Sequence, residues 1–385
     1  MQRSIDTDPP HRLRTRRVMV GDVPIGGGAP VSIQSMTLAS PVDLAATRAE
    51  IEKLADAGVE IVRTAVPNEA AADNLAALVE GAPVPLVADI HFNFQLAVKA
   101  AEAGVAKLRL NPGNIGDAKR VRSVVEAARD RGIPIRIGVN AGSLERELLA
   151  EFGRPTAEAM VKSARRHVRI LEDERFEDIV ISLKASHVPL MIDAYRLAAQ
   201  EFDYPLHLGV TEAGTPRAGN IKSAIGIGTL LAEGIGDTIR VSLSADPVEE
   251  VHAARTILEA LDLRRESIRI VACPGCGRLQ VDLIRLAEAV DERTRDIRKP
   301  LTVAVMGCAV NGPGEAREAD IGIAGGKGEG LLYVRGEMVR KVPEDRIVDA
   351  LIELIDEVEP DPDPAARDAA AMTWTPDWED GAQPS

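Results

Sequence analysis

Three cysteines are the residues of this sequence best suited to redox or metal chemistry. Cys273 and Cys276 stand in "VACPGCGR", and Cys308 stands in "VMGCAVNGPGEA". The C-x₂-C spacing lets two thiolates reach one metal centre across a tight turn, which the intervening Pro-Gly pair favours. Cys308 follows the next predicted strand, so all three sulfurs can converge if the two strand ends are neighbours. In a large intracellular chain this pattern favours metal or redox chemistry over a disulfide framework.

The fourth ligand of such a centre is not a cysteine. A structural zinc site takes a fourth cysteine or histidine, but the last histidine of the chain, His252, precedes this segment. A carboxylate, another oxygen ligand, water or substrate is left for the fourth position. Glu315 follows Cys308 by seven residues, after a predicted Gly-Pro-Gly turn. An iron–sulfur cluster with three thiolates and one weaker oxygen ligand keeps one iron open for chemistry. The sequence therefore predicts a reactive cluster, with Glu315 either its fourth ligand or only a carboxylate at the start of a helix.

Four cations, Arg63, Arg109, Arg136 and Lys184, stand at the ends of predicted strands in a chain of net charge −14. Converging over one mouth, they indicate an anionic substrate, and phosphate or diphosphate best matches the guanidinium fork. The alternative is that each forms a strand-end salt bridge. Further polar side chains stand at the same strand ends: Gln34, Ser35, Asp89, His91, Asn93, Asn111, Asn140, Ser186, His187, His207, Thr211, Glu212, Arg240 and Ser242.

Eight short apolar runs alternate with helix-length stretches and position these residues. The predicted strands are 31–36, 60–66, 84–90, 107–112, 134–139, 178–185, 206–212 and 237–244. Amphipathic segments such as 43–58 and 157–174 lie between them, and Gly58, Gly104, Gly132 and Gly234 mark helix ends. Eight such units predict a (β/α)₈ TIM-type barrel. A doubly wound open sheet is the rival, but no GxGxxG follows the first strand.

The pattern changes after about residue 262. We expect a strand into the cysteine turn, a helix over 279–296, a strand over 301–310, hairpin strands within 319–342 and a closing helix over 344–359. The predicted domains are therefore a substrate-binding barrel over 1–262 and a small α+β domain over 263–359. The Pro-, Ala- and Asp-rich tail, 360–385, is predicted to be disordered.

Composition limits the classes of partner. The negative net charge and an aromatic content of 3% argue against nucleic-acid binding. We see no apolar run of about 18 residues and no secretory signal, so we expect a cytoplasmic protein without a membrane span. The basic run "RLRTRR", residues 12–17, is interpreted as a solvated or salt-bridged segment, and "AGGKGEG", residues 324–330, as a hairpin turn and not a phosphate loop.

The motifs resemble a known family. "QSMT", "ADIHF", "LRLNPGN", "IRIGVNAGSL", "SLKAS", "PLHLGVTEAG", "CPGCGR" and "GCAVNGPGEA" stand in this order. Together they are similar to the bacterial 4-hydroxy-3-methylbut-2-enyl diphosphate synthases of the non-mevalonate isoprenoid pathway, over roughly residues 12 to 358. The acidic tail and "LASPVD" depart from the family pattern. The resemblance implies a TIM-type barrel followed by a cluster domain that resembles sulfite-reductase modules.

The resemblance also implies the reaction and the site. The substrate would be 2-C-methyl-D-erythritol 2,4-cyclodiphosphate, opened and dehydrated with two electrons from flavodoxin or ferredoxin. A [4Fe–4S] cluster would be held by Cys273, Cys276, Cys308 and Glu315. Glu212 would act as the acid–base group, and the substrate-binding residues would be Arg63, His91, Arg109, Asn111, Arg136 and Lys184. The family is homodimeric, and its cluster domain caps the barrel of the partner subunit.

Two other classes of function remain open at this stage. One is a non-redox barrel transferase, because pterin-binding methyltransferase barrels share the strand rhythm and the Asn- and Asp-rich rim. The other is a regulatory barrel that carries a zinc-stabilised appendage. A radical-SAM enzyme is excluded, because the sequence holds no CxxxCxxC. An iron, labile sulfide and zinc assay separates these readings.

Overall fold

The computed structural model describes residues 12–308 and 312–361. The chain divides into two compact units, the first ending at Arg264 and the second beginning at Arg265. From residue 362 onward, the tail predicted to be disordered lies outside the described residues.

The first unit is an eight-stranded parallel barrel. Its sheet runs in the order β8-β7-β6-β5-β4-β3-β10-β9, and a parallel bridge between Ile181 of β8 and Leu206, beside β9, joins the two ends. The strands are β3 (Ser32–Met36), β4 (Ile61–Ala65), β5 (Leu86–Asp89), β6 (Lys107–Arg109), β7 (Ile135–Asn140), β8 (Ile179–Lys184), β9 (His207–Leu208) and β10 (Thr238–Ile239). The predicted (β/α)₈ barrel is confirmed.

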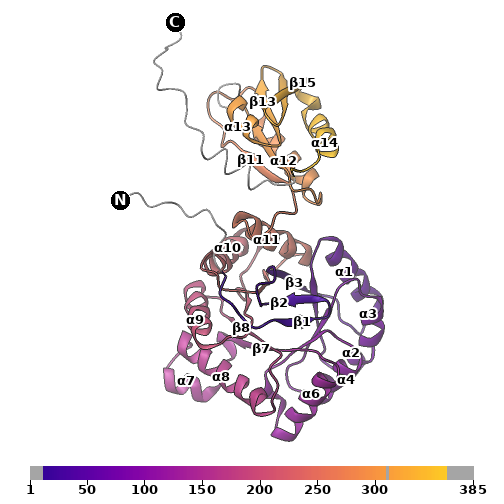
Figure 1. The fold of residues 1–385 in the computed structure, drawn as a ribbon, viewed down its shortest axis with the longest axis vertical. Helices are drawn as coiled ribbons and strands as arrows, with labels where there is room; N and C mark the ends of the chain where they lie inside the picture. Colours follow the sequence, from indigo (N-terminus) through magenta and orange to yellow (C-terminus); the bar gives the residue numbers. More distant parts are fainter. Residues whose placement is uncertain (1–11, 309–311, 362–385) are drawn as a thin grey trace. The chain divides into compact units, whose positions relative to one another are not determined.

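Helices surround this barrel (Figure 1). They are α1 (Leu44–Asp56), α2 (Glu69–Asp73), α3 (Leu75–Gly81), α4 (Phe94–Glu102), α5 (Pro112–Ile115), α6 (Ala118–Asp130), α7 (Arg146–Phe152), α8 (Ala157–Asp173), α9 (Val188–Glu201), α10 (Pro216–Ala232) and α11 (Pro247–Ala260), with a 3-10 turn, η1, over Ala141–Ser143. The four glycines predicted to end helices follow α1, α4, α6 and α10 and adopt left-handed φ angles of 62° to 90°.

Two strands are much shorter than their apolar runs predict. β9 and β10 each hold two residues, whereas the runs cover 206–212 and 237–244. Val210 and Val241 remain fully buried in the outer core beyond the regular pairing. Burial continues after the strand ladder stops, so an apolar run overestimates strand length here.

A hairpin that the sequence analysis did not predict closes the amino-terminal end of the barrel. β1 (Val18–Val20) and β2 (Val23–Ile25) pair antiparallel across a two-residue turn at Gly21 and Asp22. Val20 and Ile25 are fully buried against Ile61, at the start of β4, and Val87 of β5. Figure 1 shows the hairpin across this end of the barrel. A ligand must therefore enter from the other end, where the strands finish.

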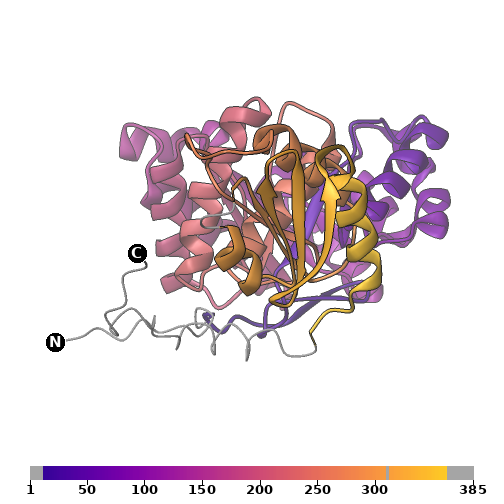
Figure 2. The same ribbon diagram turned by 90° about the horizontal axis from the view of Figure 1, so that it is seen from above.

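The second unit is a five-stranded mixed sheet with helices on both faces. Its order is β11-β12-β13-β14-β15, parallel through β13 and antiparallel beyond it. The elements are β11 (Arg269–Ala272), α12 (Leu283–Thr294), β12 (Thr302–Met306), α13 (Gly312–Glu318), β13 (Ile321–Gly326), β14 (Glu329–Val334), β15 (Glu337–Pro343), η2 (Glu344–Arg346) and α14 (Ile347–Glu357). The predicted α+β unit is confirmed, and α14 runs alongside the sheet as the yellow helix of Figure 2.

Alternation along β12 divides the core of this unit. Val303 and Val305 pack in the main cluster with α12 and α14, whereas Ala304 and Met306 face the opposite side, with Ala319 after α13. α13 can lie close to the sheet because β13 has Gly322 there: an added Cβ would come within 2.5 Å of the Ala316 Cβ. The segment predicted as a Gly-Pro-Gly turn is instead the first turn of α13. A proline near a helix start loses no intrahelical hydrogen bond, so it does not end the helix.

Candidate functional sites: a cationic barrel interior and a cysteine loop

The barrel interior is polar. Along β7, Ile135, Ile137 and Val139 belong to the outer core, so the alternate residue Arg136 points inward, as Gly138 does. The same alternation applied to the other strands places polar residues inside where branched apolar residues usually fill a TIM barrel. The inward-facing charged residues are Arg63, Asp89, Lys107, Arg109, Arg136, Lys184 and Arg240.

Asp89, at the end of β5, is the acidic centre of this group. Its carboxylate lies 3.0 Å from Arg109 Nη1, 3.4 Å from Arg63 Nε and 3.7 Å from His91 Nε2. Burial raises the pKa of Asp89, but the charges of Arg63, Arg109 and Arg136 outweigh burial, and the net pKa lies below its ordinary value. Asp89 is therefore a carboxylate at neutral pH. Burial also lowers the pKa of Arg63 to about 10, against the opposing charge of Asp89.

Arg136 and Lys184 form no ion pair with a carboxylate of the described residues. Arg136 is 1% exposed, and its Nε and Nη1 find no hydrogen-bond partner among the described residues. Burial, then the charges of Arg63 and Arg109, push the pKa of Arg136 well below its ordinary value. Burial, then Arg240 and Arg136, do the same to the pKa of Lys184. Unsatisfied buried donors of one sign fit a site that an anion completes.

The charge of Arg240 is balanced by a carboxylate on a helix, that of Glu250. Its Nε lies 3.1 Å from Glu250 Oε2 of α11, and the same carboxylate accepts from Ser35 Oγ at 3.1 Å and Leu243 N at 3.0 Å. Among the described residues, six basic side chains face inward (Arg63, Lys107, Arg109, Arg136, Lys184 and Arg240), against two carboxylates, Asp89 and Glu250. Neither Lys107 nor Glu250 was predicted from the sequence. Lys107 could have been found from strand alternation, because it precedes Arg109 by two residues.

A glycine on β7 makes room for Arg109. Arg109 Nη2 donates to Gly138 O at 3.1 Å, and Asn111 Nδ2 donates to the same oxygen at 3.0 Å. Gly138 N donates back to Asn111 Oδ1 at 2.8 Å. A Cβ on Gly138 would stand 2.5 Å from Arg109 Nε. Only glycine therefore allows the Arg109 guanidinium its present position.

Gly138→Ala is expected to lower kcat/KM about 10- to 100-fold, because the methyl group displaces Arg109 from the position that binds substrate. Steady-state kinetics of the folded variant measure this effect. Gly142→Ala is the matched control, since a Cβ there meets no atom within 4 Å. Equal kinetics for Gly138→Ala and the parent protein would show that the position of Arg109 is unimportant.

His91 and Glu212, two further predicted site residues, lie in loops at the carboxyl end of the barrel. The His91 side chain is 61% exposed, and Arg109 Nη1 lies 3.4 Å from its Nδ1. Glu212 follows β9, is exposed, and has a φ of 53°. The left-handed region costs a non-glycine residue roughly 1 kcal/mol or more. Such strain is often found at functional sites, and it is consistent with a role for Glu212.

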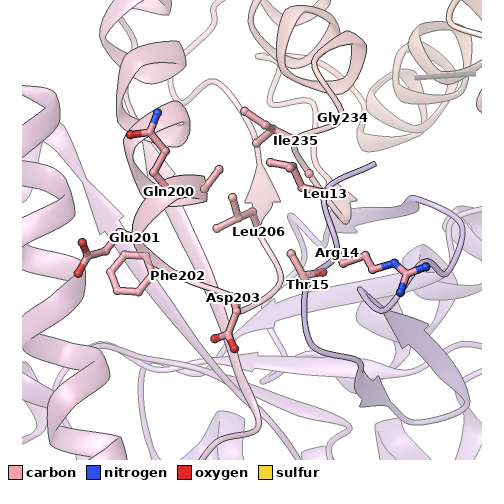
Figure 3. Close-up of a pocket in the computed structure, with 12 residues that line it drawn as sticks. Leu13, Arg14, Thr15, Gln200, Glu201, Phe202, Asp203, Leu206, Gly234 and Ile235 are labelled. Carbon is pink, nitrogen blue, oxygen red and sulfur yellow. The ribbon is translucent and has the colours of Figure 1, made fainter. Parts of the chain in front are cut away.

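The basic run at residues 12–17 lies at the other end of the barrel. Arg12 is 2.8 Å from Asp237, and Arg16 is 2.8 Å from Asp203 and 2.9 Å from Glu177. The salt-bridged interpretation of this run is confirmed. A cleft of about 380 Å³ beside it is lined by residues that include Leu13, Phe202 and Leu206 (Figure 3). The inward-facing cations do not line this cleft.

The three cysteines lie at one edge of the second sheet. Cys273 directly follows β11 and Cys308 lies two residues after β12, and these strands are parallel neighbours. Cys273 N donates to Val305 O at 3.3 Å, and Gln280 N donates to Gly307 O at 2.9 Å. The cysteine loop, residues 273–280, is thereby held against the end of β12. The predicted proximity of the two strand ends is confirmed.

The four predicted ligands do not form a closed cage. Cys308 is buried, Cys273 is half-buried, and Cys276 and Glu315 are exposed. Among the described residues, no three His, Cys, Asp or Glu side chains gather as a metal site would require. Residues 309–311, which connect Cys308 to α13, lie outside the described part of the chain.

Arg278 favours the thiolate form of Cys276. Its Nε donates to Cys276 Sγ at 3.5 Å. This hydrogen bond is the main cause that lowers the pKa of the Cys276 thiol. The thiolate is the form that binds metals. The thiols of the loop therefore fit a metal centre bound by thiolates, although the side chains of the four predicted ligands do not enclose a common point.

Fold and sites together define a two-unit protein, a TIM barrel with a cationic interior followed by a cysteine-bearing α+β unit. The GcpE TIM-barrel domain family matches residues 15–255, and the GcpE C-terminal domain family matches residues 269–357. The chain belongs to the GcpE family, which confirms the resemblance drawn from its motifs.

Three relatives are named 4-hydroxy-3-methylbut-2-en-1-yl diphosphate synthase (flavodoxin). The relative from Geobacter sulfurreducens is 59% identical over 347 residues, which cover 90% of this chain and 98% of that protein. Those from Symbiobacterium thermophilum and Anoxybacillus flavithermus are 57% and 56% identical, over 90% of this chain and 94% and 96% of theirs. This name is that of a flavodoxin-dependent enzyme, so it favours a redox enzyme over the pterin transferase and the regulatory barrel.

More distant structures resemble the barrel. Yersinia pestis dihydropteroate synthase aligns over 64% of this chain and 99% of its own, at 14% identity and a TM-score of 0.45. This similarity is too low to bear on function. None of the helices within 12–308 and 312–361 combines the length and apolar character that crossing a bilayer requires.

Proposed function

We propose that this protein is an oxidoreductase that converts 2-C-methyl-D-erythritol 2,4-cyclodiphosphate to 4-hydroxy-3-methylbut-2-enyl diphosphate. The relatives that share over half of its residues bear the name of this activity. Two electrons and two protons enter, the ring C–O bond and one C–OH bond break, a C=C bond forms, and water leaves. The observation that carries the proposal is the surplus of buried, incompletely bonded cations inside the barrel.

In this proposal the barrel, residues 1–262, holds the diphosphate. Arg136 and Lys184 bind its phosphoryl oxygens from below. Arg63 and Arg109 also bind it, and each keeps its ion pair with Asp89. His91 and Asn111 complete the substrate contacts. A diphosphate would give charge-assisted hydrogen bonds to the Arg136 nitrogens that lack partners in the described chain. Asp89 and Glu250 keep three of the guanidinium groups, those of Arg63, Arg109 and Arg240, in place before substrate arrives.

Glu212 is assigned the acid–base role. It is exposed, follows β9, and has strained backbone geometry at the end of the barrel through which a ligand enters. Its carboxyl group would deliver or accept a proton at an oxygen of the substrate, and departure of a hydroxyl group as water requires such a proton.

The residues proposed to hold a [4Fe–4S] cluster in the domain 263–359 are Cys273, Cys276, Cys308 and Glu315. Three thiolates and one carboxylate suit such a cluster, and Arg278 favours the thiolate form of Cys276. When bound, the cluster would supply electrons and a Lewis-acidic iron for the departing oxygen. We further propose flavodoxin or ferredoxin as electron donor, a homodimer, and a cytoplasmic location; the names of the relatives specify flavodoxin.

A direct test combines anaerobically reconstituted protein, the cyclic diphosphate and reduced flavodoxin. The expected result is a product with the mass and fragmentation of 4-hydroxy-3-methylbut-2-enyl diphosphate, formed only when all three are present. Intact substrate after prolonged incubation, with iron and sulfide bound and reduced flavodoxin in excess, would refute the proposed activity.

Glu315→Ala is expected to give protein that assembles a cluster and then loses it more quickly, with turnover lowered about 100-fold or more, because one iron lacks its protein ligand. Iron and sulfide content before and after gel filtration, together with electron paramagnetic resonance of the reduced protein, measures this without relying on activity. Glu318→Ala is the matched control, since Glu318 is an exposed carboxylate of the same helix. Equal iron retention and turnover in the two variants would mean that Glu315 is only a helix-start residue.

A further inference from the structure

Lys107 is a buried cation that the proposed reaction does not use. It is the first residue of β6 and is fully buried, and its Nζ has no hydrogen-bond partner among the described residues. Leu108 packs in the outer core, so Lys107, like Arg109, points into the barrel interior. His207, at the start of β9, is also fully buried, with neither ring nitrogen bonded within the described chain.

The groups around Lys107 are overwhelmingly cationic. The charged and titratable groups that face the interior with it are Arg63 of β4, Asp89 of β5, Arg109 of the same strand β6, Arg136 of β7, Lys184 of β8, His207 of β9 and Arg240 beside β10. The β1–β2 hairpin contributes two apolar side chains, Val20 and Ile25. The carboxylate of Asp89 is already shared between Arg63 and Arg109, and no described carboxylate lies within ion-pair distance of Lys107.

An unpaired ammonium in such a place is unstable. Removing a charge from water costs several kcal/mol even in a relaxed protein, so a buried lysine tends to lose its proton. Burial, followed by the charges of Arg136 and Arg63, drives the pKa of Lys107 well below its ordinary value. A dianion bound to those two arginines would reverse the balance, because it replaces net repulsion by attraction.

We propose that Lys107 takes up a proton when a diphosphate binds in the barrel, so that part of the charge matching the ligand is drawn from solvent at the moment of binding. Lys107 is a charge-compensating residue beneath the site and needs no direct contact with substrate. The inference rests on the proposed function only in taking the barrel interior as the diphosphate site. It assigns Lys107, which precedes Arg109 by two residues, a role of its own.

Linkage fixes the sign of the pH dependence. Below the pKa of Lys107 in the ligand-free protein the amine is already protonated, and above its pKa in the complex it stays neutral. Between these two values each binding event takes up a proton, so affinity for the diphosphate falls as pH rises. Because burial lowers the ligand-free value, this window opens below the ordinary lysine pKa of about 10.4.

The experiment is titration calorimetry of the oxidised holoenzyme with the cyclic diphosphate, without reductant, from about pH 7 to about pH 10. At each pH two buffers of different ionisation enthalpy give the number of protons exchanged. Both phosphorus centres of the ligand are fully ionised through this range, so the ligand exchanges no proton. Wild-type protein is expected to take up protons when the ligand binds in this range. Lys107→Met is expected to take up fewer protons per bound ligand, with a largest difference of about one.

Lys119→Met is the matched control, because Lys119 is an exposed lysine at the start of α6, and it is expected to match the wild type. Lys107→Met is also expected to unfold at an equal or higher temperature without ligand, because a buried unpaired amine is replaced by an apolar side chain of similar length. Tight binding with identical proton uptake in wild type and Lys107→Met overturns this proposal alone. Binding to wild type with no uptake at any pH overturns it without any variant. No binding of the diphosphate at all overturns the proposed function as well.

Discussion

Cys308→Ser is expected to abolish cluster assembly, leaving under one iron per chain where the parent protein holds about four. Cys308 is the buried member of the three cysteines and sits at the end of β12, against which the cysteine loop is fixed. Serine is a much poorer ligand to iron than a thiolate, so four protein ligands fall to three, two thiolates and one exposed carboxylate. Turnover is expected to fall below detection. Iron and labile sulfide assays after anaerobic reconstitution measure the loss directly.

Val305→Thr is the control for this variant. Like Cys308→Ser it places a hydroxyl group in a buried position close to the end of β12, but on the face that packs against α12 and α14. It is expected to cost roughly 1–3 kcal/mol of stability and to keep its iron. Full iron content and full turnover in Cys308→Ser would remove Cys308 from the ligand set. Loss of iron from both variants would instead point to damage of the sheet.

The alternation of apolar runs and helix-length segments was sufficient to predict the barrel, because each βα unit has its own apolar run and its own helix end in the sequence. Gly58 and Gly132 fall one residue past a helix cap, as a left-handed C′ position requires. The β1–β2 hairpin carried a local signal as well, a Gly-Asp pair between "VMV" and "VPI". It was missed because three-residue strands are too short for alternation to stand out.

The candidate site was predictable where it depends on a single strand and not where it depends on packing. Lys184 could be found because it ends β8. Arg136 was also found, but it is the second residue of β7 and does not lie at the strand end, where it was predicted. Glu250 could not be found from the sequence. It lies on α11, ten residues after its partner Arg240, and the spacing of the two residues does not indicate that α11 directs this carboxylate inward. The shared position of Asp89 between two arginines is likewise a product of barrel closure.

The cysteine spacing predicted a common location but not a common centre. Parallel pairing of β11 and β12 brings Cys273 and Cys308 to one edge, which follows from consecutive strands joined by a helix. Whether the sulfurs point at one centre depends on side-chain rotamers and on the ligand itself, since a metal supplies much of the free energy that orders its own ligands. The spacing of the cysteines in the sequence does not show that contribution.

Arg136→Met is expected to lower kcat/KM for the cyclic diphosphate by about 10²- to 10⁴-fold while leaving the ligand-free protein equally or more stable. Arg136 is 1% exposed and holds two nitrogen atoms without partners in the described chain. Two charge-assisted hydrogen bonds to phosphate, each worth roughly 1.5–3 kcal/mol, account for the loss in catalysis. Replacing an unpaired buried charge by an apolar side chain of similar reach removes a desolvation penalty, which accounts for the stability.

The opposite signs of these two effects are what identify Arg136 as a ligand-binding residue. A guanidinium group that merely held the barrel together would lose stability and activity in parallel. Arg136→Lys is expected to fall between, since it keeps the charge but loses the planar fork, and the exposed Arg131→Met serves as the control that alters neither quantity. Thermal unfolding and steady-state kinetics on the four proteins measure both effects. If Arg136→Met proved unstable yet retained its kcat/KM, the buried cations would be structural and the substrate would have to bind elsewhere.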